Sequence, residues 1–247
     1  HPFPENRLAH TQQMLDSAQA NYAALTWDRE PYLRRLDGMV YGDDPRQGYF
    51  DGQALYHPGL KFQVVFPAGW RTNNGFSAVT GLAEKQDGLL QLELAGTEPI
   101  ATQLQTFLAQ QGVTAGATSN AAVNGLPAAS AQFGAQLEKG PVRGYITFIT
   151  YGGRNYRLMT LATDAQFAAY DAPMRSWVRS FRPLTDAARI NVKPTRIKIV
   201  KLGGPMTVTA FNARYPSVIP VDRVALLNGV ATGATFPAGK LVKQVVK

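Results

Sequence analysis

Apolar residues alternate with polar ones in several stretches between Leu60 and Ala162, and this period of two constrains the fold most strongly. In the first stretch Leu60, Phe62 and Val64 fall on one side of the chain, ahead of a stop at Pro67. Such alternation is typical of half-buried strands. The expected strands cover residues 60–66, 76–83, 89–95, 128–136, 142–151 and 155–162.

Two helical patterns interrupt and close this series, over residues 98–111 and 164–181. In the second, the apolar residues from Phe167 to Phe181 repeat at three and four, and Asp164 is placed to cap the first turn. Strands in runs, without strict alternation with helices, predict an antiparallel sheet with helices packed against it. The expected fold class is therefore α+β.

The N-terminal segment predicts helices. Residues 5–27 carry apolar side chains at helical spacing, and a second short helix is expected after Pro31, whose ring fits an early helical position. Residues 41–52 are dense in turn formers and predict a loop.

Charge divides the chain unevenly. Residues 1–183 hold fifteen basic and fifteen acidic side chains, whereas residues 184–247 hold ten basic and two acidic ones, so the whole net charge of +8 lies there. This break, with Pro183 and Pro194 beside it, predicts a helical lead-in at 1–45, an α/β sandwich at 46–185, a linker at 186–195 and a basic module at 196–247. Such a module favours an anionic neighbour, and a solvated basic surface is the alternative.

The basic module itself predicts a strand at 196–201, helices at 207–215 and 221–227, and a closing strand at 240–246. Overall, 45% of the residues are hydrophobic and 17% are charged, which is typical of globular domains. No apolar run approaches the roughly 20 residues that a membrane span requires. The absence of cysteine excludes thiol catalysis, disulfides and cysteine zinc sites.

Few residues are of the types that catalysis needs. The three histidines, His1, His10 and His57, lack helical metal spacing, and neither H-E-x-x-H nor G-x-S-x-G occurs. The nearest imitation of the serine motif, at 75–79, lacks its second glycine, and residues 233–240 resemble a phosphate loop with the wrong spacing. No catalytic residue, metal ligand or cofactor is therefore expected in this chain. Asp43, Asp44 and Asp51 are open to a hard cation or to solvent alone, and Tyr49, Trp70 and Phe76 to a pocket or to plugging a sheet end.

The N-terminal His1-Pro2-Phe3-Pro4-Glu5-Asn6-Arg7-Leu8, followed by a helix, resembles the end of the catalytic domain in bacterial envelope zinc metallopeptidases of the HtpX and CaaX-protease clan. Gly48-Tyr49-Phe50-Asp51-Gly52 with His57-Pro58 and Pro67-Ala68-Gly69-Trp70 resembles the accessory region after that domain. The resemblance implies the non-catalytic C-terminal part of such an enzyme. Zinc would then belong to a missing upstream protease domain, which His1 would approach in the intact protein.

Two further stretches resemble known modules. The order of elements from Leu60 to Phe181 is similar to the PsbP-like α/β/α sandwich, which is generally a binding or docking scaffold. Residues 199–204, 226–229 and 236–241 resemble a LysM module. That likeness implies a cell-wall glycan site at Gly203, Gly204, Thr207, Asn228 and Gly229, and a LysM-shaped spacer that binds only its own protein is the alternative.

These observations favour two functional hypotheses. The first is a non-catalytic accessory region of an extracytoplasmic zinc metallopeptidase, in the periplasm or elsewhere in the bacterial envelope, that docks or positions substrate or cell wall. Its partners would be its own upstream protease domain and peptidoglycan or another envelope polyanion, with no nucleic acid. The second is a free-standing wall-binding or lipid-binding protein. An enzyme working through the sandwich would need a cleft with perturbed carboxylates.

Overall fold

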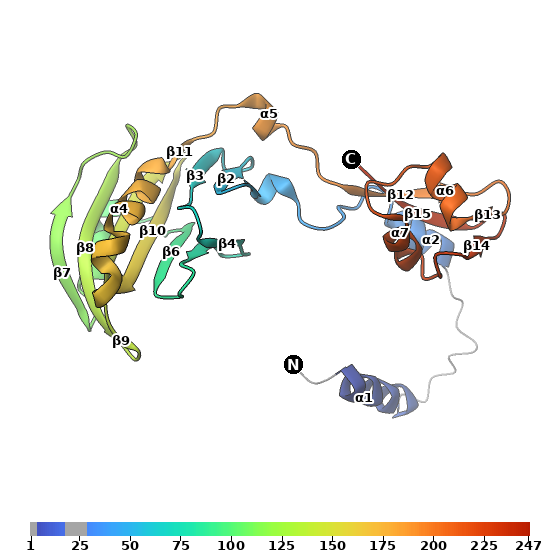
Figure 1. Ribbon diagram of the computed structural model, residues 1–247, viewed down its shortest axis with the longest axis horizontal. Coiled ribbons are helices and arrows are strands. Elements are labelled where there is room, and N and C mark those ends of the chain that lie inside the picture. Colours follow the sequence, from blue (N-terminus) through green and yellow to red (C-terminus); the bar gives the residue numbers. More distant parts are fainter. Residues whose placement is uncertain (1–3, 18–28) are drawn as a thin grey trace. The chain divides into compact units, whose positions relative to one another are not determined.

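The computed structural model describes residues 4–17 and 29–247 (Figure 1). Contacts divide the chain into two compact units. The first, the split unit, combines the chain up to Tyr41 with residues Arg196–Lys247. The second, the inserted unit, is Gly42–Thr195. One unit is therefore continuous in sequence, whereas the other is built from segments on either side of it.

The inserted unit contains a seven-stranded antiparallel sheet. Its longest strands are the central ones, which pair over as many as ten residues. In spatial order the strands are β4 (Arg71–Asn74), β5 (Ala78–Leu82), β6 (Gly88–Leu94), β10 (Arg154–Thr163), β9 (Gly140–Tyr151), β8 (Ala128–Leu137) and β7 (Val113–Ser119).

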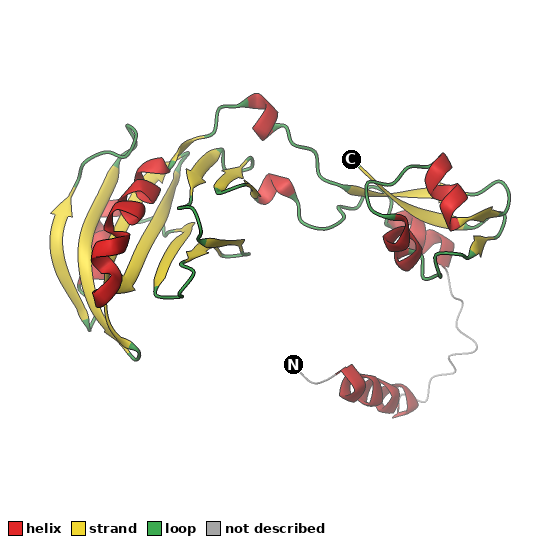
Figure 2. Ribbon diagram, viewed as in Figure 1, coloured by secondary structure: helices red, strands yellow, loops and turns green. Residues whose placement is uncertain are grey.

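Each face of this sheet carries one long helix (Figure 2). On one face, Met174 and Trp177 of α4 (Asp164–Ser180) pack on Leu92 and Leu158. On the other, Leu104 and Phe107 of α3 (Ile100–Leu108) pack on residues that include Ile146 and Phe148. Successive residues of a strand point to opposite faces, so the period of two does produce a sheet buried on both sides. The expected α+β class with an antiparallel sheet is confirmed.

A small sheet adds to the α4 face of the inserted unit. Its strands lie in the order β1 (Tyr49–Asp51), β2 (Ala54–His57), β3 (Phe62–Val65) and β11 (Arg182–Pro183), and the short 3-10 helix η2 (Pro45–Gln47) precedes it. Just after β3, the Phe66 ring packs 5.5 Å from that of Trp177. A Cβ at Gly81 in β5 would lie 2.6 Å from the same Phe66 ring, so glycine is what lets the two sheets approach there.

The split unit is built on a two-stranded sheet of β12 (Arg196–Lys201) and β15 (Leu241–Val246). A second pair, β13 (Met206–Thr207) with β14 (Thr235–Phe236), lies between them in sequence, as do helices α6 (Val208–Arg214) and α7 (Val221–Leu227). Phe211, Val224 and Val242 are wholly buried in one cluster, which covers one face of the β12–β15 sheet. The expected order of strand, helix, helix and strand is therefore present.

The N-terminal segment completes this unit. After α2 (Arg29–Arg35), the N–H of Gly38 donates to the carbonyl of Ile197 (2.8 Å), and the N–H of Ile197 donates to the carbonyl of Met39 (2.8 Å). The Asp37 carboxylate accepts from the N–H of Ile199, and Glu30 lies 3.8 Å from Lys201. Residues 37–40 thus pair with the free edge of β12.

Several of these features differ from the sequence-based expectation. Residues 29–41, expected within a separate lead-in at 1–45, pack with 196–247. Part of the linker expected at 186–195 is folded, because α5 (Ala187–Ile190) is held to the inserted unit through Arg189. Its guanidinium pairs with Asp51 (2.9 Å) and stacks over Tyr56 (3.9 Å).

The loop expected at 41–52 contains η2 and β1. Strand β1 closes a tight hairpin with β2, in which Gly52 adopts a φ of 59°. Helix α1 spans Pro4–Ser17, and the remainder of the helix expected at 5–27 lies outside the described residues. Of the helices in the described ranges, none is both long and apolar enough to span a membrane.

The pairing of residues 37–40 with β12 predicts the behaviour of a chain cut between the units. We expect cleavage at a site-specific protease sequence inserted after Val192 to leave residues 196–247 bound to the rest of the chain. The reason is that the hydrogen bonds between residues 38–39 and Ile197 survive the cut. Gel filtration of the cleaved protein should give one peak that contains both fragments.

The matched control for this experiment carries the same cleavage site but lacks residues 29–41, and its C-terminal fragment should elute alone. The pairing would be contradicted if the C-terminal fragment also eluted alone after cleavage of the protein that retains residues 29–41.

Candidate functional site

A cleft of about 780 Å³ lies in the inserted unit, between the large and small sheets. Its apolar side is formed by strands β5, β6 and β10. There Val79 lies opposite Leu92, and Leu94 lies opposite Tyr156, so all four side chains share the face of the large sheet that carries α4. Tyr156 is buried, which raises the pKa of its phenol.

The facing wall comes from the β2–β3 hairpin and from the segment that precedes β1. His57, Leu60 and Phe62 line it from the hairpin. The centroid of the Phe62 ring lies 5.1 Å from that of His57 and 5.3 Å from that of Tyr156. These three rings pack in a row that connects the facing wall to the large sheet. The cleft is therefore framed by packed rings.

His57 is held in one orientation. Its Nδ1 accepts the N–H of Leu60 (3.1 Å), and burial lowers the pKa of the ring from its ordinary value of 6.5. An Nδ1 that accepts a hydrogen bond is unprotonated, so at neutral pH the ring is uncharged with its proton on Nε2. His57 thus acts as an aromatic wall residue that closes the hairpin turn.

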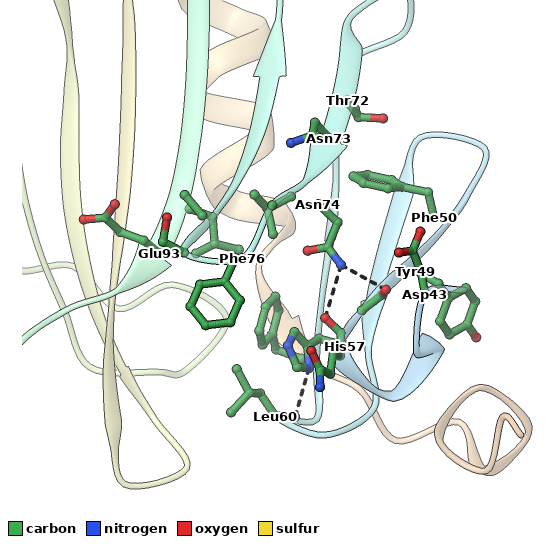
Figure 3. A pocket seen from close by; sticks show the side chains of 18 of the residues that line it. Asp43, Tyr49, Phe50, His57, Leu60, Thr72, Asn73, Asn74, Phe76 and Glu93 are labelled. Carbon is green, nitrogen blue, oxygen red and sulfur yellow. Dashed lines mark hydrogen bonds between the residues drawn. The ribbon is translucent and has the colours of Figure 1, made fainter. Parts of the chain in front are cut away.

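Asn74 fixes the width of the cleft on one side. Its Nδ2 donates to the carbonyls of Gln47 (3.2 Å) and Gly48 (3.0 Å), which ties the end of β4 to the start of the small sheet (Figure 3). Gly48 has a φ of 108°, and a Cβ at that position would lie 2.9 Å from the Asn74 amide nitrogen. Glycine is therefore required at this contact on both grounds.

Phe76 stands at the mouth. It lies in the turn between β4 and β5 and is fully exposed, and Leu94 beside the cleft is 52% exposed. Figure 3 shows the Phe76 ring between Glu93, on the large sheet, and His57 with Leu60 on the small one. Two large apolar side chains are therefore exposed beside this cleft.

The charged residues that line the cleft are acidic. Within the described part of the chain they are Asp43, Asp44 and Glu93. Asp44 pairs with Arg46 (2.6 Å) and Glu93 with Arg157 (2.6 Å), while neither arginine lines the cleft. The charged residues lining this cleft are thus opposite in sign to the net charge of +8 of the chain.

Part of this cleft was predicted from the sequence. Tyr49, Phe76 and Asp43 with Asp44 line it, whereas Asp51 pairs with Arg189. Trp70 was expected beside them as a pocket or plug residue, and it is a core residue, 7% exposed and packed edge-on against Tyr170. Asn74 and Leu94 were missed, because neither belongs to a motif and their roles depend on which strands become neighbours.

Ser77 and His57 both line the cleft, but among the described residues no hydrogen bond joins them. Among the described residues, Tyr145 and Arg175 lower the pKa of Asp171, and Arg34 and Lys201 lower that of Glu30; neither carboxylate lines the cleft. In the described ranges no three metal-ligating side chains converge, and His1 lies outside those ranges.

The expected glycan residues lie in the split unit. Gly203, Gly204 and Thr207 follow β12, and the Thr207 hydroxyl caps α6 by accepting the N–H of Ala210 (3.1 Å). Gly229 is exposed, with a φ of 67° in the turn after α7. The binding of a glycan by Gly203, Gly204, Thr207 and Gly229 remains a prediction.

Asn228 has a different environment, since it is 7% exposed. Its Nδ2 donates to the carbonyls of Val224 and Lys243 (both 2.9 Å), and its Oδ1 accepts the N–H of Lys243 (2.8 Å). The amide therefore pairs with β15 as a neighbouring strand would.

No protein-family model matches the chain, and no curated protein matches it in sequence. Among solved structures, it is similar to the cyanobacterial PsbP protein CyanoP from Synechocystis sp. PCC 6803, with 11% identity and a TM-score of 0.43, over 53% of this chain and 91% of that one. LpqN of Mycobacterium tuberculosis, described as involved in cell envelope biogenesis, has 15% identity and a TM-score of 0.40, over 62% and 95%. Likeness at this level carries no argument about function.

The lowered pKa of His57 gives a pH-dependent stability. In the unfolded chain His57 takes up a proton near pH 6.5, whereas in the folded protein it does so only at lower pH. The free energy of unfolding therefore decreases as the pH falls below about 6.5. We expect urea unfolding, followed by the fluorescence of buried Trp70 and Trp177, to show this loss between pH 7.5 and 5.5. His57→Asn keeps an acceptor for Leu60 and should flatten the pH dependence, and an unchanged slope would assign it to other groups.

The three hydrogen bonds of Asn228 predict its contribution to the split unit. Asn228→Ala leaves the N–H and carbonyl of Lys243 without these partners and should cost about 2–3 kcal/mol. Amide exchange of Lys243 should accelerate accordingly, whereas the control Thr209→Ala, at an exposed position of α6, should leave it unchanged. Unchanged exchange in Asn228→Ala would contradict the structural role.

Proposed function

We propose that this chain is a non-catalytic binding protein whose inserted unit holds the apolar part of an amphipathic small molecule in the cleft. The observation that carries the proposal is Phe76, which is fully exposed at the mouth of a cleft lined by Leu92 and Tyr156. An apolar lining with a few polar groups at the mouth is what ligand sites generally present.

Charge defines the class of ligand. The charged side chains that line the cleft within the described residues, Asp43, Asp44 and Glu93, are acidic, and at neutral pH His57 is uncharged. Arg46 and Arg157 offset the charge of Asp44 and Glu93 from outside the cleft. An anionic head group would be repelled by these carboxylates, while a neutral or cationic one would be accepted. The proposed ligand is thus an amphiphile with an apolar chain and an uncharged or positively charged head.

The split unit supports a second role. Residues 196–247 contain eight basic side chains and one acidic one, and α2 adds three arginines. This charge favours association with an anionic envelope polymer such as peptidoglycan. We propose that the split unit anchors the protein there, with the glycan residues of the LysM resemblance as its contact. Retention by insoluble peptidoglycan in roughly 0.5 M salt separates glycan recognition from charge, because such salt shortens the Debye length to a few ångströms.

The setting of this binding protein is also a proposal. The sequence resemblance favours an extracytoplasmic accessory region that positions substrate for a zinc metallopeptidase, with the metal held by an upstream protease domain. The alternative is a free-standing envelope protein that carries its ligand without a protease partner. Translation of the genomic sequence upstream of His1 distinguishes them: an H-E-x-x-H in the same reading frame supports the first, and a signal peptide supports the second.

Replacement of Phe76 tests the cleft. We expect Phe76→Ser to weaken binding of the neutral fluorophore N-phenyl-1-naphthylamine by about tenfold or more, since burial of a phenyl ring contributes about 1.5–3 kcal/mol. The fold should be unaffected because the ring is exposed. Leu137→Ser, at an exposed position of β8 outside the cleft, is the matched control and should bind normally.

Displacement of the fluorophore by ten-carbon amphiphiles then tests the charge argument. Decylamine and decanol should compete in wild type and decanoate should not, while Phe76→Ser should weaken binding of decylamine and decanol without changing this order. Equal loss of binding in Phe76→Ser and Leu137→Ser would contradict the site, and preferential displacement by decanoate would contradict the ligand class.

A further inference from the structure

A charge-free run distinguishes one edge of the large sheet. From Pro99 to Leu137 the chain contains no Asp, Glu, Lys, Arg or His, although 17% of all its residues are charged. The run includes α3, β7 and all of β8. Strand β7 ends the seven-stranded order, and Figure 1 shows it as the outermost strand of that sheet.

Strand β7 is exposed on both of its faces and along its outer edge. Residues Thr114–Ser119 are exposed on both faces, and among the described elements only β8 pairs with the strand. At alternate residues an antiparallel strand directs its N–H and carbonyl groups away from its neighbour. A row of backbone donors and acceptors is therefore available beyond β7.

Three other strand edges in the described part of the chain are covered or charged. At the opposite end of the large sheet, β4 is short, carries Arg71, and is tied by Asn74 to residues 47–48. In the split unit, residues 37–40 pair with β12, and Asn228 with Ser217 covers β15. Proteins use such charges and covers to prevent edge pairing. Strand β7 carries neither, and its irregularity is a register shift between Ala115 and Thr118.

We propose that β7 pairs antiparallel with β7 of a second copy of this chain, so that the two large sheets join at this edge. In a two-fold arrangement each residue of the strand lies opposite the same short stretch of its partner. Any charge in β7 would then face a like charge across the axis. A chain with a net charge of +8 can meet itself without such repulsion where its surface is uncharged, and Thr, Ala, Gly and Ser side chains permit close strand pairing.

A lysine on the edge tests this pairing. We expect the full-length protein to dimerise, with a dissociation constant on the order of 10 µM because a strand-edge contact is small. Sedimentation equilibrium from about 1 to 200 µM covers this range. Thr118→Lys should raise the constant at least about tenfold through like-charge repulsion across the axis. Thr185→Lys adds the same charge at an exposed site outside β7 and should leave dimerisation unchanged.

Single cysteines locate the contact, because the native chain has none and every disulfide formed must join two copies. Ala115→Cys and Ala117→Cys should cross-link under mild oxidation faster than Thr185→Cys. A monomeric wild type across the whole concentration range would overturn the proposal. So would a dimer that is equally stable in Thr118→Lys.

Discussion

The exchange of hydrogen bonds between residues 38–39 and Ile197 determines how the whole chain is organised. A two-stranded sheet is marginal in water unless its faces and edges are covered. Here α6 and α7 cover one face of β12–β15, residues 37–40 pair with one edge, and Asn228 pairs with the other. Since one of these covers comes from the N-terminal segment, the split unit needs both ends of the chain, and residues 42–195 are inserted within it.

The inserted unit owes its cleft to unequal covering of a single sheet. Helix α3 packs over β8 and β9, and α4 with the small sheet packs over most of the other face. Near the end of β6 the small sheet stands away from Leu94, and the space is bordered by His57, Phe62 and Phe76. Asn74 holds the two sheets at this separation through the carbonyls of residues 47 and 48. The cleft thus follows from where two layers diverge.

Alternation in the sequence predicted β3, β5, β6, β8, β9 and β10, but it missed the short β2, whose Leu55 is buried. It did not predict β4 and β7, because an edge strand exposed on both faces has no apolar period to detect. The same limit applies to the site. Phe76 and Tyr49 were identified as aromatic residues beside turns, whereas the amide of Asn74 acquires its role only when β4 and η2 become neighbours. The amide of Asn228 matched a loop motif, and only the three-dimensional structure shows that β15 takes up its hydrogen bonds.

The discontinuous unit has a consequence for the order in which a newly made chain acquires its structure. During synthesis α2 emerges early, but its partners β12 and β15 follow only after the 154 residues of the inserted unit. The inserted unit holds all of its strands in one continuous segment, so it can form while the ribosome is still adding the C-terminal residues. Until β12 and β15 have been synthesised, Leu33 and the edge-pairing residues 37–40 remain exposed and can contact other chains. In the final step, the two parts of the split unit come together across residues 42–195. Because these residues are already folded, this step costs less chain entropy than the closure of an unfolded loop of the same length.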